Sequence, residues 1–104
     1  MVELVITKSE YDEMLKNNAL LMVDYFATWC SPCEMIAPKI EEFAKAFLRI
    51  KFIKVDVDAS RDIYEAEGIS AVPTFKLFKD GVKVGEVVGA RAEMIKAELE
   101  KLAA

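Results

Sequence analysis

The chain has 104 residues, with 14 lysines and arginines, 18 aspartates and glutamates, two cysteines and no histidine. The missing histidine excludes Ser-His-Asp triads, Cys-His nucleophile pairs and imidazole-ligated metals, and we expect no metal site. A net charge of −4 disfavours nucleic acid and anionic membrane surfaces as partners, since both need clustered positive charge. No apolar run reaches membrane-spanning length, and the N-terminus has no basic region followed by a long apolar run. We therefore expect a soluble, monomeric, cytoplasmic protein with one domain over residues 1–104.

The apolar pattern of the N-terminal half predicts two strands and two helices. Residues 4–6 alternate as a short strand, and residues 7–10 resemble a capping box that opens a helix ending near Asn18. Residues 20–27 are almost all apolar, which is typical of a central strand covered on both faces. Over residues 31–47 the apolar positions recur every three or four residues and form one helix face, at Ile36, Ile40, Phe43 and Phe47.

The C-terminal half continues the alternation. A second buried strand over 52–57 is followed by a short helix over 60–66. Residues 74–78 and 82–88 flank a turn containing glycine and predict a hairpin, and a last helix has an apolar stripe at Ile95, Leu99 and Leu102. Helices that alternate with buried strands imply parallel pairing. We therefore expect an α/β fold, with a central mixed sheet of about five strands flanked by about four helices and an antiparallel hairpin at one edge.

Cys30 and Cys33 lie where the central strand gives way to the long helix. Residues three apart are neighbours on one helix face, within the ~4.4 to 6.8 Å Cα separation that a disulfide tolerates. Pro32 suits the first helical turn, where its missing N–H has no intrahelical partner to lose. Cys30 is expected at the helix N-terminus, where unpaired N–H groups and the helix dipole stabilise a thiolate. This placement favours a redox-active dithiol.

Three other roles fit the cysteine pair less well. A structural disulfide that closes a four-residue loop gains only ~2 kcal/mol in the chain-entropy model, and the cytosol is reducing. A structural zinc ion needs four ligands, so the pair would have to be completed by a symmetric dimer. Cysteines buried as small hydrophobic residues do not fit the Ser-Pro between them or the strand-to-helix corner.

Several segments resemble the thioredoxin family in order and spacing over essentially the whole chain. The most specific are Trp29-Cys30-Ser31-Pro32-Cys33, Val72-Pro73-Thr74-Phe75 and Val88-Gly89-Ala90. The resemblance implies the thioredoxin fold and a protein disulfide reductase, in which Cys30 attacks a partner disulfide and Cys33 resolves the mixed disulfide. It also implies no bound cofactor, electrons from NADPH through a thioredoxin reductase, and disulfide-containing target proteins as partners.

The resemblance also assigns roles to two charged residues within apolar strands. Asp24 is the only charge in residues 20–27, where burial raises the pKa of a carboxyl group. The resemblance makes it the group that moves the proton of Cys33, whereas a structural hydrogen-bonding role is the alternative. Lys54 interrupts the next strand and is expected beside Asp24, favouring its charged form. Its alternative is a lysine that extends to solvent.

The expected docking surface surrounds the cysteines. The resemblance implies a cis Val72–Pro73 bond that leaves the backbone of Val72 free to pair with an extended partner segment, although Pro also suits a loop that enters a strand. Trp29 lies at the strand-to-helix corner, which favours an exposed ring over the alternative of a core residue. An exposed aromatic group of this kind commonly marks an interaction surface. The full expected set is Trp29, Ser31, Pro32, Val72, Pro73, Gly89 and Ala90.

Two positions depart from the family pattern. Ser31 replaces the usual glycine, and Glu34 stands where lysine or arginine is common, so we expect Cys30 to be slightly less acidic than in basic-flanked relatives. Two other functions remain open. A disulfide oxidase or isomerase usually has histidine between its cysteines and a secretory signal, and a non-catalytic thioredoxin-fold binding module would normally have lost one cysteine.

Overall fold

The computed structural model describes all 104 residues and alternates strands with helices. The predicted order of elements is confirmed, although individual ends differ by a few residues. The elements are β1 (Glu3–Leu4), α1 (Lys8–Asn17), β2 (Leu20–Phe26), α2 (Ser31–Ala46), β3 (Lys51–Asp56), α3 (Arg61–Glu67), β4 (Thr74–Lys79), β5 (Val82–Val88) and α4 (Ala92–Ala103). None of the four helices is long and apolar enough to cross a membrane.

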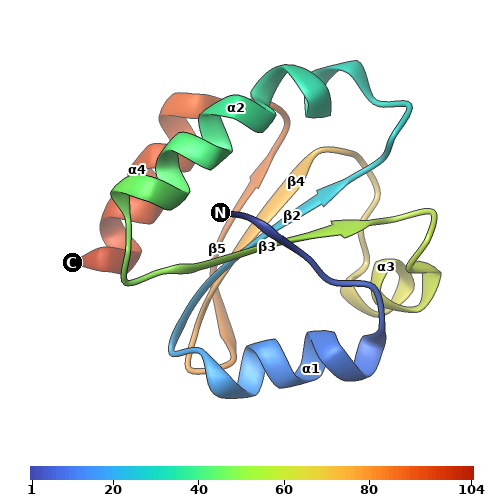
Figure 1. The fold of residues 1–104 in the computed structure, drawn as a ribbon, viewed down its shortest axis with the longest axis horizontal. Helices are drawn as coiled ribbons and strands as arrows, with labels where there is room; N and C mark the ends of the chain where they lie inside the picture. The colour runs from blue at the N-terminus through green and yellow to red at the C-terminus, as the bar shows by residue number, and fades with distance from the viewer.

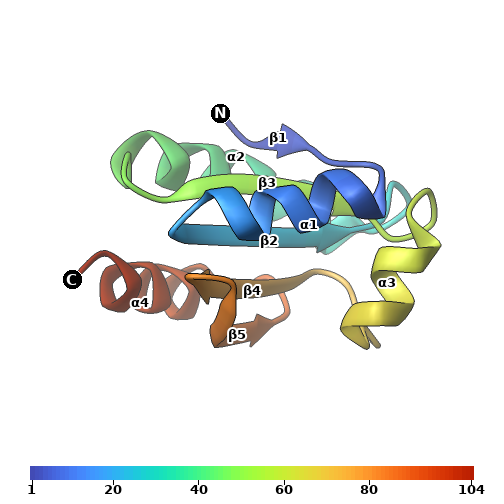
Figure 2. The same ribbon diagram turned by 90° about the horizontal axis from the view of Figure 1, so that it is seen from below.

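The five strands form one mixed sheet in the order β1-β3-β2-β4-β5 (Figure 2). β3 pairs in parallel with β1 and β2, whereas β4 is antiparallel to both β2 and β5. β2 is therefore the central strand, as its apolar run predicts. The parallel strands β2 and β3 end at the same edge of the sheet, and the cysteine-containing corner follows the end of β2.

Helices cover both faces of the sheet, with α2 and α4 on one face and α1 and α3 on the other (Figure 1). The side chains of β2 alternate between the two resulting cores. Met22 packs with α2 and α4, whereas Val23 and Tyr25 pack with α1 and α3. This period of two places Asp24 on the same face as Met22, beneath the start of α2.

The first strand and the first helix cap differ from the prediction. β1 ends at Leu4, and Ile6 is half exposed, because the chain turns there toward α1. The Thr7 hydroxyl accepts from the Glu10 N–H at 3.1 Å, as in a capping box. The Glu10 carboxylate, however, accepts from the N–H of Ile6 at 3.3 Å, one residue before the cap. The cap therefore fixes the chain direction before the helix as well as its first turn.

Candidate active site

The two cysteines form a disulfide at the N-terminus of α2, with their Cα atoms 5.3 Å apart. Cys30 is the N-cap residue, and its Sγ accepts from the backbone N–H of Cys33 at 3.2 Å. Both residues are buried in the core that faces α1 and α3. After reduction, an N–H directed at the Cys30 sulfur favours the thiolate over the thiol, and the helix dipole acts in the same direction.

The residues between and after the cysteines form the first turn of α2. Ser31 begins the helix, and Pro32 occupies a first-turn position as predicted. Ser31, Pro32 and Glu34 are all exposed. The Glu34 carboxylate is therefore in solvent, where its repulsion of a Cys30 thiolate is weak. The same carboxylate is stabilised at the helix N-terminus.

Asp24 is buried in β2, with only 7% of its surface exposed, and its Oδ1 has no hydrogen-bond partner. It lines a cavity of about 250 Å³ together with Cys33, Phe26 and Lys54. Burial raises the pKa of Asp24 from 3.8 to about 7, while the positive charge of Lys54 acts in the opposite direction. A carboxyl group with this pKa exchanges its proton readily near neutral pH, and it shares its cavity with one of the two cysteines.

Lys54 lies directly opposite Asp24 in the parallel β2–β3 pair. It is half-buried, and its Nζ lies 5.7 Å from the centroid of the Phe26 ring. The ring thus occupies one side of the ammonium group, which remains close enough to Asp24 to favour its ionised form. The predicted neighbourhood of Lys54 and Asp24 is confirmed.

Trp29 is 70% exposed beside the cysteines. Its indole N–H donates to the Asp58 carboxylate at 2.8 Å, which holds the ring over a groove of about 270 Å³. Val72 and Tyr64 line the same groove, and the Arg61 guanidinium lies 4.9 Å from the Tyr64 ring centroid. An exposed indole next to a groove can contact a partner while leaving the disulfide accessible.

The Val72–Pro73 peptide bond is cis, as the resemblance implies. Val72 is half-buried and packs against the core that contains both cysteines. The carbonyl of Pro73 accepts from the N–H of Gly89 at 2.8 Å, and Gly89 has a φ of 100°, which L side chains rarely adopt. Pro32 and Ala90 are exposed, but they do not line the groove that Trp29 shares with Val72.

The family model for thioredoxin matches residues 2–101. The chain is 43% identical to thioredoxin 1 of Plasmodium falciparum over 104 residues, which cover all of both chains. The chain belongs to the thioredoxin family. It is also 45% identical to thioredoxin-1 of Saccharomyces cerevisiae over 96 residues, which cover 92% of this chain and 93% of the yeast protein.

Solved thioredoxins share the fold closely. The solution structure of oxidised thioredoxin from Plasmodium falciparum has a TM-score of 0.94 at 43% identity over 100% of both chains. The crystal structure of oxidised mitochondrial thioredoxin 3 from Saccharomyces cerevisiae has a TM-score of 0.94 at 34% identity, covering 97% of this chain and 95% of that one. The predicted thioredoxin fold is confirmed.

Family membership and the cysteine pair establish the reaction. The chain is a protein-disulfide oxidoreductase of the thioredoxin family, which performs dithiol–disulfide exchange through Cys30 and Cys33. Thioredoxins bind no cofactor and receive electrons from NADPH through a reductase. No group of three or more histidine, cysteine, aspartate or glutamate side chains is arranged to hold a metal ion.

The sequence patterns missed part of the thioredoxin site, namely Asp58 and the groove formed with Arg61 and Tyr64. A signal for Asp58 was available, because it follows the end of β3 at the sheet edge where β2 also ends. The carboxyl ends of neighbouring parallel strands lie side by side, so residues just beyond both ends meet. The indole partner of Asp58 could be inferred in this way, whereas the cation–ring contact of Arg61 could not.

Proposed function

We propose that Cys30 is the attacking nucleophile and Cys33 the resolving thiol of a disulfide reductase. The Cys30 thiolate attacks one sulfur of a partner disulfide, which forms a mixed disulfide and releases the other partner sulfur as a thiolate that takes up a proton. Cys33 then loses its proton and attacks the Cys30 sulfur. The Cys30–Cys33 disulfide forms, and the second partner sulfur leaves and is protonated. The observation that carries this assignment is Cys30 at the N-cap of α2, with its sulfur facing a backbone N–H.

Asp24 accepts the proton of Cys33 during resolution and returns it in the reverse reaction. Its pKa near 7 suits transfer in both directions, and it shares a cavity with Cys33. The unpartnered Oδ1 leaves an acceptor free for this proton or for a water molecule that relays it. Lys54 tunes the proton affinity of Asp24 through its charge.

Of the seven residues expected at the docking surface, Pro73 is buried. Partners dock on the surface formed by the other six, which are Trp29, Ser31, Pro32, Val72, Gly89 and Ala90. The exposed indole of Trp29 and the groove that it shares with Val72 support this surface. An extended segment of the partner pairs with the backbone of Val72, as in β-augmentation. The partners are a thioredoxin reductase and disulfide-containing proteins. We further propose that the chain acts as a single-domain monomer in the cytoplasm.

Insulin reduction with dithiothreitol tests the assignment, because reduced B chains precipitate and scatter light. The unchanged chain accelerates the precipitation, and Cys30→Ser abolishes the acceleration. Pre-reduced Cys33→Ser, freed of dithiothreitol and mixed with insulin, accumulates a mixed disulfide between Cys30 and the target, which non-reducing electrophoresis detects. Reductase activity in Cys30→Ser, or a trapped adduct in Cys30→Ser rather than Cys33→Ser, contradicts the assigned roles. A redox titration against glutathione separates a reductant from an oxidase.

A further inference from the structure

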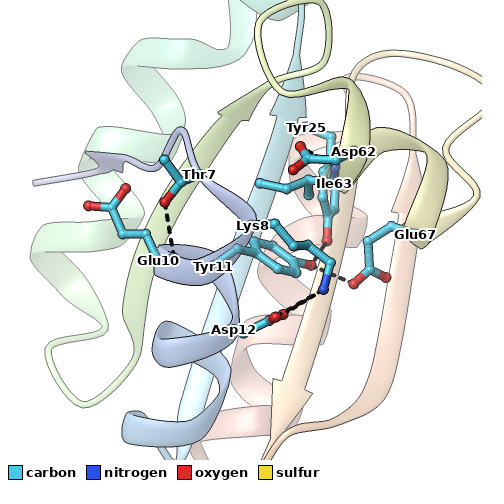
Figure 3. A network of polar contacts seen from close by, with 9 residues as sticks. All are labelled: Thr7, Lys8, Glu10, Tyr11, Asp12, Tyr25, Asp62, Ile63 and Glu67. Atoms are coloured by element: carbon cyan, nitrogen blue, oxygen red, sulfur yellow. Dashed lines mark hydrogen bonds and ion pairs between the residues drawn. The ribbon is translucent and has the colours of Figure 1, made fainter.

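Glu67, the last residue of α3, is held by two donor side chains from other elements. The ammonium group of Lys76, in β4, donates to the main-chain carbonyl of Glu67 at 2.6 Å and to its Oε1 at 3.1 Å. The Tyr11 hydroxyl, in α1, donates to Oε2 at 2.8 Å (Figure 3). The Lys76 side chain is only 7% exposed. These contacts join α1, α3 and β4 at a single carboxylate.

The two tyrosines complete this network. The Tyr11 and Tyr25 hydroxyls are hydrogen-bonded to each other (Figure 3). Because the proton of Tyr11 is directed at Glu67, Tyr25 acts as the donor to Tyr11. Burial raises the pKa of both hydroxyls, so both remain protonated donors at neutral pH. The Lys76 ammonium also lies 5.8 Å from the centroid of the Tyr25 ring.

The position of this network in the chain is informative. Residues 68–73 connect α3 to β4 and contain Val72 and Pro73. The Lys76–Glu67 contacts link the residue just before this connection to the third residue of the strand that follows it. The carbonyl that Lys76 contacts belongs to the last residue of α3, where a main-chain carbonyl has no intrahelical partner. Lys76 therefore holds the point at which the helix ends and the connection begins.

At its start, the N–H groups of Gly68 and Ile69 donate to the carbonyls of Glu65 and Tyr64, both at 3.2 Å, and so tie the connection back to α3. Two further hydrogen bonds lie near its end. The Thr74 hydroxyl donates to the carbonyl of Ala71 at 2.6 Å, and the Gly89 N–H donates to that of Pro73 at 2.8 Å. These ties orient the residues on either side of Val72 relative to β4 and β5. Lys76 alone fixes the end of α3 relative to β4 through a main-chain contact. The backbone of Val72 therefore lies between the end of α3 and the start of β4, and hydrogen bonds hold both in place.

Stability alone does not require a lysine at position 76. A buried ion pair is often replaceable by apolar side chains without loss of stability, and an apolar residue would fit the strand pattern of β4. The ammonium instead supplies directed contacts to one main-chain oxygen and one carboxylate. Such contacts specify a position, whereas apolar packing tolerates small displacements.

We infer that Lys76 is a positioning residue for partner docking: by holding the carbonyl and carboxylate of Glu67, it fixes residues 68–73 and hence the Val72 backbone that pairs with the partner. The inference rests on the proposed docking role of Val72. A protein disulfide engages this backbone, whereas a small aromatic disulfide such as DTNB has no main chain to pair with. Loss of the Lys76 contacts therefore weakens docking of proteins without altering the reactivity of the cysteines.

Lys76→Met tests this separation, because methionine retains the length and apolar contacts of lysine but has no donor. We expect KM for insulin, with dithiothreitol as reductant, to rise at least fivefold while kcat stays within twofold. The second-order rate of the pre-reduced variant with DTNB, after removal of dithiothreitol, also stays within twofold. Lys76→Arg retains charge and donors and restores KM to within threefold of the unchanged chain.

Tyr11→Phe is the matched control, because it removes one donor from Glu67 and leaves the Lys76 contacts in place. We expect its denaturation midpoint to fall without a change in KM. Glu67→Gln, which keeps the main-chain carbonyl, gives a smaller rise in KM than Lys76→Met and serves as the test variant if Lys76→Met does not fold. An unchanged KM in folded Lys76→Met, or an equal rise in Tyr11→Phe, overturns the inference. Failure of the unchanged chain to reduce insulin would instead overturn the proposed function.

Discussion

Asp24 is predicted to lower the stability of the oxidised protein at neutral and alkaline pH, and Asp24→Asn is predicted to remove that penalty. The carboxyl group is buried without a hydrogen bond to Oδ1. Burial raises its pKa from 3.8 to about 7 in the folded protein, despite the opposing charge of Lys54. The folded state therefore keeps a proton that the unfolded chain has already released. Asparagine has nearly the same shape and never ionises.

The size of the effect follows from the difference between the two pKa values. A difference of about 3 pH units corresponds to about 4 kcal/mol of differential stability. Below pH 4 both states are protonated, and the penalty is absent. Between pH 4 and 7 the folded state binds more protons than the unfolded state, so its stability falls with rising pH at ~1.4 kcal/mol per pH unit. Above pH 7 both states are ionised, and the penalty is constant.

Urea denaturation of the oxidised protein at a series of pH values from 4 to 9 measures this effect. The free energy of unfolding of Asp24→Asn should match that of the unchanged chain at pH 4 and exceed it by as much as about 4 kcal/mol at pH 8. Asp12→Asn is the control, because Asp12 is exposed and paired with Lys8; its effect should stay within about 1 kcal/mol at every pH. A pH-independent difference for Asp24→Asn would refute the raised pKa.

Three further variants test the docking surface and its surroundings. Trp29→Phe removes the indole donor to Asp58; KM for insulin should rise severalfold while stability changes by about 1 kcal/mol or less, and an unchanged KM would argue against docking at the indole. Glu34→Lys should lower the pKa of the Cys30 thiol in the reduced protein, because reversing the charge stabilises the thiolate by about 1 kcal/mol at about 8 Å in water. This pKa is measured from thiolate absorbance, and an unchanged value would show that Glu34 does not act on Cys30. Gly89→Ala should destabilise the protein by about 1–3 kcal/mol in urea, since φ is positive there, and unchanged stability would mean that the loop relaxes.

The sequence was most informative where a charged residue interrupts an otherwise apolar strand. Asp24 and Lys54 are two such residues, and they meet because their strands are neighbours in the parallel part of the sheet. The register places the two residues directly opposite each other. Cys30 could be placed at a helix N-terminus because the helical spacing begins just after it and Pro32 suits the first turn. In each case the decisive contact lies within one strand pair or one helical turn.

The network around Glu67 could not be predicted in the same way. Lys76 interrupts β4 as Lys54 interrupts β3, which signals a polar partner on that face. The identity of the partner depends on how α3 packs against the sheet, and no periodicity encodes that placement. Tyr11 and Glu67 are 56 residues apart in the sequence and meet only because α1 and α3 cover the same face (Figure 1). Long-range contacts between helices of one layer thus escape patterns that describe single elements.

The exposed indole of Trp29 has a practical consequence. It is the only tryptophan of the chain, so the emission excited near 295 nm comes from one position, adjacent in sequence to the disulfide. A disulfide at close range accepts an electron from an excited indole and quenches it. Opening the Cys30–Cys33 bond should therefore brighten the protein, and a partner that covers the ring should shift the emission toward shorter wavelengths. The chain thus carries its own optical probe, which follows electron transfer and partner association in real time without a label.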